Sequence, residues 1–117
     1  MKLAIVGSRT FNDYKKLEKE VNAYCPREEL EEIISGGAKG ADSLAEQYAC
    51  EYGIDLNVIK ASWRTYGKQA GYMRNVVIIE QADQVIAFWD GESKGTKHTI
   101  DTAKKAGKPV FIVNIKP

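Results

Sequence analysis

The sequence predicts a three-layer α/β fold in which a five-stranded parallel sheet carries helices on both faces. Short apolar runs of the kind found in buried strands alternate along the chain with segments of helical periodicity. Strands joined by helices pair in parallel, and right-handed crossovers distribute the helices over both faces of the sheet. The chain has 117 residues, 44% of them hydrophobic and 28% charged, which fits one domain spanning residues 1–117.

The five expected strands are short runs dominated by apolar residues. The first, 3–6, is apolar at every position, as expected for a strand that is buried on both faces. The others are expected at 32–35, 56–59, 85–89 and 110–113. Helices separate these runs, so the strands are expected to form βαβ units rather than hairpins.

Four helical segments are expected between the strands. The first has Asn12 as its expected N-cap and stops at Pro26, because proline cannot continue a helix. The second ends near Gly53, a residue type that closes helices readily. The third covers 72–81, after a less regular stretch, and the fourth runs from about 96 to 106.

The composition excludes several classes of function. The formal net charge is +1, so the chain lacks the overall basic field of many nucleic-acid binders, and we expect no nucleic-acid partner. No apolar segment approaches the length of a membrane span, and the first apolar run is too short for a signal peptide. Cys25 and Cys50 lack metal-site spacing and are expected to be apolar fillers in a reducing compartment. We therefore expect a cytoplasmic protein without a metal or a cofactor.

The most informative segment is the glycine-rich loop 36–42, between the second strand and the second helix. Such a turn exposes backbone N–H groups where the helix dipole is positive, which suits a phosphate or another anion. The side chain of Lys39 adds a positive charge, while Asp42 is expected to cap the helix or to accept hydrogen bonds from ribose hydroxyls. The predicted ligand residues of this loop are Gly36, Gly37, Ala38, Lys39, Gly40 and Asp42.

Two further loops are expected at the same edge, because ligands of parallel sheets bind beyond the carboxyl ends of the strands. The loop after the first strand offers a tight turn, a hydroxyl and a guanidinium that can hold a phosphate. The loop after the fourth strand again combines small residues, a lysine and a helix start. The alternatives are an ordinary turn for the first loop, and for the second a flexible turn capped by Thr96. The predicted ligand residues are Gly7, Ser8, Arg9, Asp90, Ser93, Lys94, Gly95 and Thr96.

Polar and aromatic residues of the third helical region complete the predicted pocket. Arg74 and Asn75 interrupt an apolar helical segment, so we predict that this pair is directed into the pocket. Trp63, Tyr66 and Tyr72 are expected to stack on a base or form a lid, or else to lie in the core or in a dimer interface.

Taken in order, these motifs resemble the SLOG superfamily, and within it the small YspA/YpsA-like proteins. That superfamily groups Rossmann-like domains similar to the LOG phosphoribohydrolases and the DNA-processing protein DprA. The resemblance covers nearly the whole chain and implies a Rossmann-like three-layer sandwich with a nucleotide-type pocket at the strand ends. The motifs that carry it are Val6-Gly7-Ser8-Arg9, the segment 34–42, Arg74-Asn75, Ser93-Lys94-Gly95-Thr96 and Gly107-Lys108-Pro109-Val110.

One departure from the LOG pattern bears on catalysis. Where LOG enzymes carry a catalytic glutamate after the second glycine-threonine pair, this chain has Thr99, and it has Asn75 where they have lysine. Another carboxylate, such as Asp42, Asp90 or Glu92, would have to assist cleavage of a glycosidic bond. Asp42 is the candidate, and no other catalytic residue is assigned.

The sequence leaves three functions open. The first is binding of a nucleotide or nucleotide-derived signal, such as an ADP-ribose-like molecule, by a sensor or a sequestering protein. The second is a phosphoribohydrolase or N-glycosidase acting on nucleoside monophosphates, and the third is DprA-like binding of single-stranded DNA. The missing glutamate favours binding over hydrolysis, near-neutral charge disfavours DNA, and the lone His98 is given no catalytic role. We expect a homodimer or a larger assembly, because the helices leave apolar surface to cover.

Overall fold

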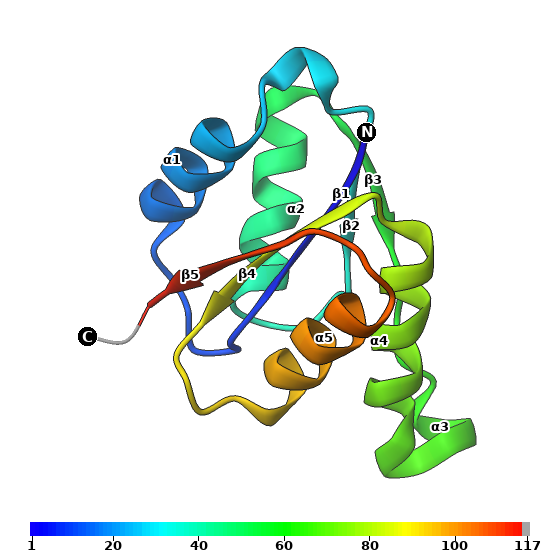
Figure 1. The fold of residues 1–117 in the computed structure, drawn as a ribbon. Helices are drawn as coiled ribbons and strands as arrows, with labels where there is room; N and C mark the ends of the chain where they lie inside the picture. Colours follow the sequence, from blue (N-terminus) through cyan, green and yellow to red (C-terminus); the bar gives the residue numbers. More distant parts are fainter. Residues whose placement is uncertain (116–117) are drawn as a thin grey trace.

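The structure, a computed structural model that describes residues 1–115, confirms the three-layer α/β fold (Figure 1). Residues 116–117 of the expected domain lie outside the described range. All strands pair in parallel, in the order β3-β2-β1-β4-β5. The strands are β1 (Lys2–Gly7), β2 (Glu32–Ser35), β3 (Asp55–Val58), β4 (Gln84–Trp89) and β5 (Val110–Asn114).

Helices cover both faces of the sheet, and two apolar clusters hold the layers together. In Figure 1, α1 (Tyr14–Tyr24) and α2 (Ala41–Tyr52) lie on one side of the sheet, with α4 (Ala70–Gln81) and α5 (Lys94–Lys105) on the other. Alternate residues of β1 point to opposite faces: Leu3 and Ile5 join the first cluster, Ala4 and Val6 the second. β1 is therefore buried on both faces, as its continuous apolar run predicts.

The first helix begins one residue later than the sequence analysis expected. Asp13, rather than Asn12, is the N-cap of α1, and its carboxylate accepts a hydrogen bond from the backbone N–H of Lys16 at 3.1 Å. Both residue types cap helices well, and the carboxylate adds a favourable interaction with the helix dipole. Leu17 and Val21 then point into the first cluster.

The stretch expected to be irregular contains two short helical segments, α3 (Trp63–Tyr66) and the 3₁₀ helix η2 (Gly67–Gln69). A further 3₁₀ helix, η1 (Arg27–Glu29), precedes β2. Trp63, Tyr66 and Tyr72 are all about half exposed, so the core alternative for them is wrong. Trp63 and Tyr66 belong to α3, which projects beyond the sheet (Figure 1), whereas Tyr72 lies on α4.

Both cysteines are free thiols, but they occupy different environments. Cys25 is buried and packs in the first cluster, as expected for an apolar filler. Cys50 lies exposed on α2, so the same expectation is wrong for this residue. Its position follows from the helical period, because Ala45, Tyr48 and Ala49 take the buried face of α2. Within residues 1–115, no helix combines the length and apolar character needed to cross a membrane.

Candidate functional site

The candidate site lies at the carboxyl ends of the strands, where the strand order changes direction. The chain runs from β1 through β2 to β3 on one side of the sheet, and continues with β4 and β5 on the other side of β1. Ligands of open α/β sheets bind at such a switch point. A cavity of about 320 Å³, called here the central cavity, lies between the loops that follow β1, β2 and β4. Its lining residues are Val6, Gly7, Ser8, Arg9, Thr10, Ala38, Asp42, Arg74, Asn75, Ile78, Asp90, Ser93, Gly95, Thr96 and Thr99.

Two glycines, Gly7 and Gly40, allow neighbouring segments of the backbone to approach one another closely beside this cavity. A Cβ on Gly7 would lie 2.5 Å from the carbonyl oxygen of Phe88 on the neighbouring strand. Gly40 has φ 75°, and a Cβ there would lie 2.4 Å from the carbonyl oxygens of both Ser8 and Arg9. Next to it, the N–H of Ala41 donates to the Ser8 carbonyl at 3.2 Å. Gly40 does not line the cavity, so the structure gives it a role in joining two ligand loops.

Asp42 and Arg74 face each other across Gly36. Asp42 Oδ2 accepts a hydrogen bond from the N–H of Ala38 at 3.1 Å. A Cβ on Gly36 would lie 2.9 Å from that oxygen and 3.1 Å from Arg74 Cδ. Only glycine at position 36 therefore avoids close contact with both side chains. Burial raises the pKa of Asp42 above its usual range, while the loop N–H groups and Arg74 act in the opposite direction. The carboxyl thus holds the glycine loop through its hydrogen bond to Ala38.

The pair Arg74 and Asn75 lies in the cavity wall, where it links three segments of the chain. Arg74 Nη1 donates to the Gly36 carbonyl at 3.1 Å, and Nε donates to Asn75 Oδ1 at 3.3 Å. Asn75 is only 5% exposed, and its Nδ2 lies 3.3 Å from both the Gly95 carbonyl oxygen and His98 Nδ1. Burial is the main cause that lowers the pKa of Arg74. The guanidinium is thereby fixed against the glycine loop.

His98 is connected to this network, which the sequence analysis did not anticipate. With Asn75 as the donor, His98 Nδ1 is the acceptor, and the neutral ring carries its proton on Nε2. Burial lowers the pKa of His98, which favours the neutral form. Its ring packs against Tyr72, with 4.5 Å between ring centroids. His98 therefore accepts a hydrogen bond from Asn75 and helps to hold the amide in place.

The start of α5 is ordered by its own loop. Ser93 is the N-cap and accepts a hydrogen bond from the N–H of Thr96, and the two hydroxyls lie 3.0 Å apart. Asp90 Oδ1 accepts from the N–H groups of Glu92 and Ser93, both at 2.8 Å, and these bonds lower the pKa of Asp90. Nothing lies within 4 Å of a Cβ placed on Gly95. The packing therefore does not require glycine at this position, although Gly95 lines the central cavity.

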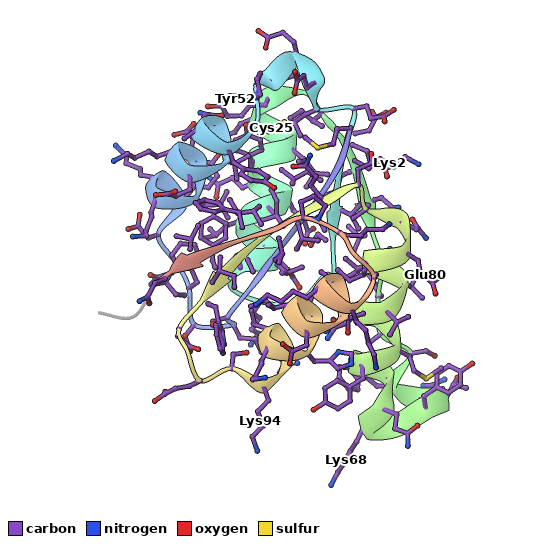
Figure 2. The ribbon with its side chains drawn as sticks, viewed as in Figure 1. Lys2, Cys25, Tyr52, Lys68, Glu80 and Lys94 are labelled. Atoms are coloured by element: carbon purple, nitrogen blue, oxygen red, sulfur yellow. The ribbon has the colours of Figure 1, made fainter. Side chains whose placement is uncertain are left out.

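The predicted ligand residues divide between two neighbouring hollows. Gly36, Gly37 and Lys39 line a second hollow of about 520 Å³ rather than the central cavity. We call it the cationic hollow; its lining residues are Arg9, Gly36, Gly37, Ala38, Lys39, Ser43, Lys60, Ala61, Trp63 and Arg74. Lys94 is exposed and extends into solvent at the start of α5 (Figure 2). Of the remaining predicted residues, all but Gly40 line the central cavity.

Several lining residues were missed by the sequence analysis. Thr99 is buried, lies one helical turn after Gly95, and donates its hydroxyl to the Gly95 carbonyl at 3.1 Å. The helical spacing from Gly95 could have placed it on the cavity side. Lys60 follows β3, and the rule for strand ends could have found it. Among the described residues, no group of three or more His, Cys, Asp and Glu side chains is arranged to hold a metal ion.

Together, the fold and the cavity at its switch point define a Rossmann-like α/β domain with a cavity at its strand ends. Residues 1–66 match the family described as "YspA, cpYpsA-related SLOG family", and the chain belongs to that family. A relative, the Gene 61 protein of Mycobacterium phage D29, is 36% identical over 91 residues, which cover 73% of each chain. The resemblance drawn from the motifs is thus confirmed.

Solved structures share the fold. The DNA processing protein A (DprA) of Streptococcus pneumoniae has a TM-score of 0.79 at 24% identity, over 95% of this chain and 49% of its own. Helicobacter pylori DprA, whose structure addresses single-stranded DNA binding, has a TM-score of 0.73 at 23% identity, over 96% and 64%. The protein TM1055 has a TM-score of 0.68 at 23% identity, over 93% and 71%. The chain therefore spans about half to two thirds of the DprA chains, and the likeness is one of fold.

Proposed function

We propose that this protein binds a nucleotide or a nucleotide-derived molecule of the ADP-ribose type in the central cavity, as a sensor or a sequestering protein. The observation that carries the proposal is that the start of α5, at Gly95 and Thr96, and the hydrogen-bonded guanidinium of Arg74 line one cavity. A helix start and an arginine both favour an anionic group such as a phosphate. Asp42 lines the same cavity and supplies an acceptor for ribose hydroxyls.

Hydrolysis of an N-glycosidic bond is the second candidate, and Asp42 is the residue that favours it. A carboxyl whose pKa is raised by burial suits a general acid. Against this, its Oδ2 already accepts a hydrogen bond from the glycine loop, and the Thr99 hydroxyl donates to the backbone where a LOG enzyme carries glutamate. The cavity thus supports binding better than cleavage.

Single-stranded DNA is the third candidate. It has one supporting feature, the exposed ring of Trp63 beside the cationic hollow, since aromatic and basic side chains together bind single strands. The fold shared with H. pylori DprA is compatible with it. The net charge of +1 provides no overall basic field, so we expect no binding at moderate salt.

Calorimetric titration with AMP, ADP, ADP-ribose and a single-stranded oligonucleotide tests the proposal. We expect at least one nucleotide to bind, and Arg74→Gln to weaken that binding by about a hundredfold, because a charged hydrogen-bond donor is lost from a half-buried site. Lys19→Gln, on the exposed side of α1, is the control for net charge and should bind normally.

The same samples separate the candidates. Chromatography of the nucleotides after incubation detects a released base, which would establish hydrolysis instead of simple binding. Loss of that turnover in Asp42→Asn would assign the carboxylate. Tight binding of the oligonucleotide alone, or no binding of any nucleotide, would refute the proposed ligand class.

We also propose that the chain forms a homodimer through α4, in a reducing, cytoplasmic setting consistent with its two free thiols. Tyr72, Met73, Val76 and Val77 each leave more than a third of their surface exposed on this helix. Apolar side chains at such spacing form a continuous face suited to a second copy. Light scattering should give twice the chain mass of 13.0 kDa, and Val76→Glu should return the monomer. A monomeric parent protein would reject the dimer.

A further inference from the structure

The cationic hollow carries more positive charge than a single phosphate requires. Its lining contains four cationic side chains, Arg9, Lys39, Lys60 and Arg74, and no carboxylate. The central cavity, by contrast, is lined by two of these cations together with Asp42 and Asp90. The two hollows therefore differ in charge although they share a wall.

Each cation of the hollow comes from a different segment of the fold. Arg9 follows β1, Lys39 lies in the loop after β2, Lys60 follows β3, and Arg74 is on α4. A Cβ on Gly37, which has φ 72°, would lie 3.4 Å from Lys60 Cγ and 3.9 Å from Cε. The lysine stem therefore lies beside the glycine loop, within van der Waals contact of a Cβ placed at position 37.

Three of the four cations, Arg9, Lys39 and Lys60, form no ion pair with the described residues. The ion pairs among residues 1–115 are Met1–Glu31 and Lys97–Asp101, and neither lies in the hollow. Burial is the main cause that lowers the pKa of Arg74, Asp42 opposes this shift, and Arg9 adds a smaller lowering because the two positive charges repel. Asp42 attracts Arg74 from the central cavity. An anion in the hollow would remove this repulsion.

Arg74 lies between the two hollows. Within the described residues its hydrogen bonds use Nε and one N–H of Nη1, which leaves Nη2 available to a ligand. Nη2 is 3.9 Å from a Cβ placed on Gly71, and Trp63 Cη2 is 3.1 Å from the same point. The free end of the guanidinium thus lies on the side of Gly71 and Trp63, and both Trp63 and Arg74 line the cationic hollow.

We infer that the cationic hollow is a second anion subsite, and that the site selects a diphosphate group which runs from the start of α5 past Arg74 to Lys60. This inference rests on the proposed function and narrows its ligand to nucleoside diphosphates and their esters, in preference to monophosphates. Arg9, Ala38 and Arg74 line both hollows, so one phosphate in each would share these residues. Lys60 contacts the second phosphate only.

The test compares inorganic phosphate with pyrophosphate at matched ionic strength, by NMR titration of the backbone amides. We expect pyrophosphate to bind at least about tenfold more tightly, with shifts at both the start of α5 and the segment 37–39. Lys60→Gln should remove most of this preference, while phosphate should still shift the amides at the start of α5 as it does in the parent protein. Lys2→Gln removes the same charge at the start of β1, away from both hollows (Figure 2), and should behave like the parent protein.

The possible outcomes separate this inference from the proposed function. Equal affinities for the two anions, or an unchanged preference in Lys60→Gln, would overturn the second subsite. If nucleoside monophosphates still bound in that case, the proposed function would stand. If Lys2→Gln lowered the preference as much as Lys60→Gln, the effect would be one of net charge, and the subsite would again be refuted.

Discussion

Replacing Gly40 by alanine is expected to destabilise the fold by about 2–6 kcal/mol, because backbone strain and overpacking each cost about 1–3 kcal/mol. Gly40 has φ 75° and ψ −127°, a conformation that side chains disfavour. Its Cβ would also meet the carbonyl oxygens of Ser8 and Arg9 at 2.4 Å. Moving these carbonyls would disturb the hydrogen bonds that the N–H groups of Phe11 and Ala41 donate to Ser8.

Gly67 provides a matched control for the part of the Gly40 effect that comes from backbone strain. Its φ of 59° and ψ of −135° are close to those of Gly40, but nothing lies within 4 Å of its Cβ position. Gly67→Ala should therefore cost only the strain of about 1–3 kcal/mol. Urea unfolding of both variants measures the difference. Equal losses would show that the loop contact is looser than the structure describes, and that Gly40 serves backbone conformation alone.

The arrangement of the layers could be predicted from the sequence because it depends on local patterns. The run from Leu3 to Val6 is apolar at every position, and both faces of β1 are indeed covered. The cap at Asp13 was missed because two neighbouring residues offered equally good caps, and their choice depends on the backbone rather than on the side-chain type. The exposed position of Trp63 depends on how far α3 projects from the sheet, which periodicity does not reveal.

The location of the candidate site could be predicted from the sequence, because the ends of the strands could be predicted. All the loops predicted to bind the ligand lie at the carboxyl ends of the strands, since parallel strands bring these ends together. The division into two hollows was not predictable, because it depends on where Arg74 crosses the glycine loop. Gly40 and Gly95 illustrate the same limit. Their residue type is identical, but one glycine is needed by packing and the other leaves space open.

Gly95 allows the ligand charge to be tested without loss of the fold. It is the second residue of α5, where a carboxylate interacts favourably with the helix dipole. Replacing glycine in a helix removes an entropic cost of about 0.5–1 kcal/mol. Gly95→Asp should therefore unfold at a slightly higher temperature than the parent protein. Because the new carboxylate would project into the open space, the same variant should bind an anionic ligand about a hundredfold more weakly.

Gly95→Asn separates this repulsion from steric exclusion, since asparagine has nearly the same shape without the charge. We expect it to lose about tenfold in affinity at most, through the filled volume alone. Calorimetric titration gives the affinities, and thermal unfolding gives the stabilities.

Equal losses in the two variants would mean that no anionic group of the ligand approaches the start of α5. Unchanged binding in both would place the ligand outside the central cavity. If a phosphate binds at the start of α5, Gly95→Asp should raise the stability of the fold and lower the affinity for the ligand. The new carboxylate interacts favourably with the helix dipole, and it competes with the phosphate for the same helix N-terminus.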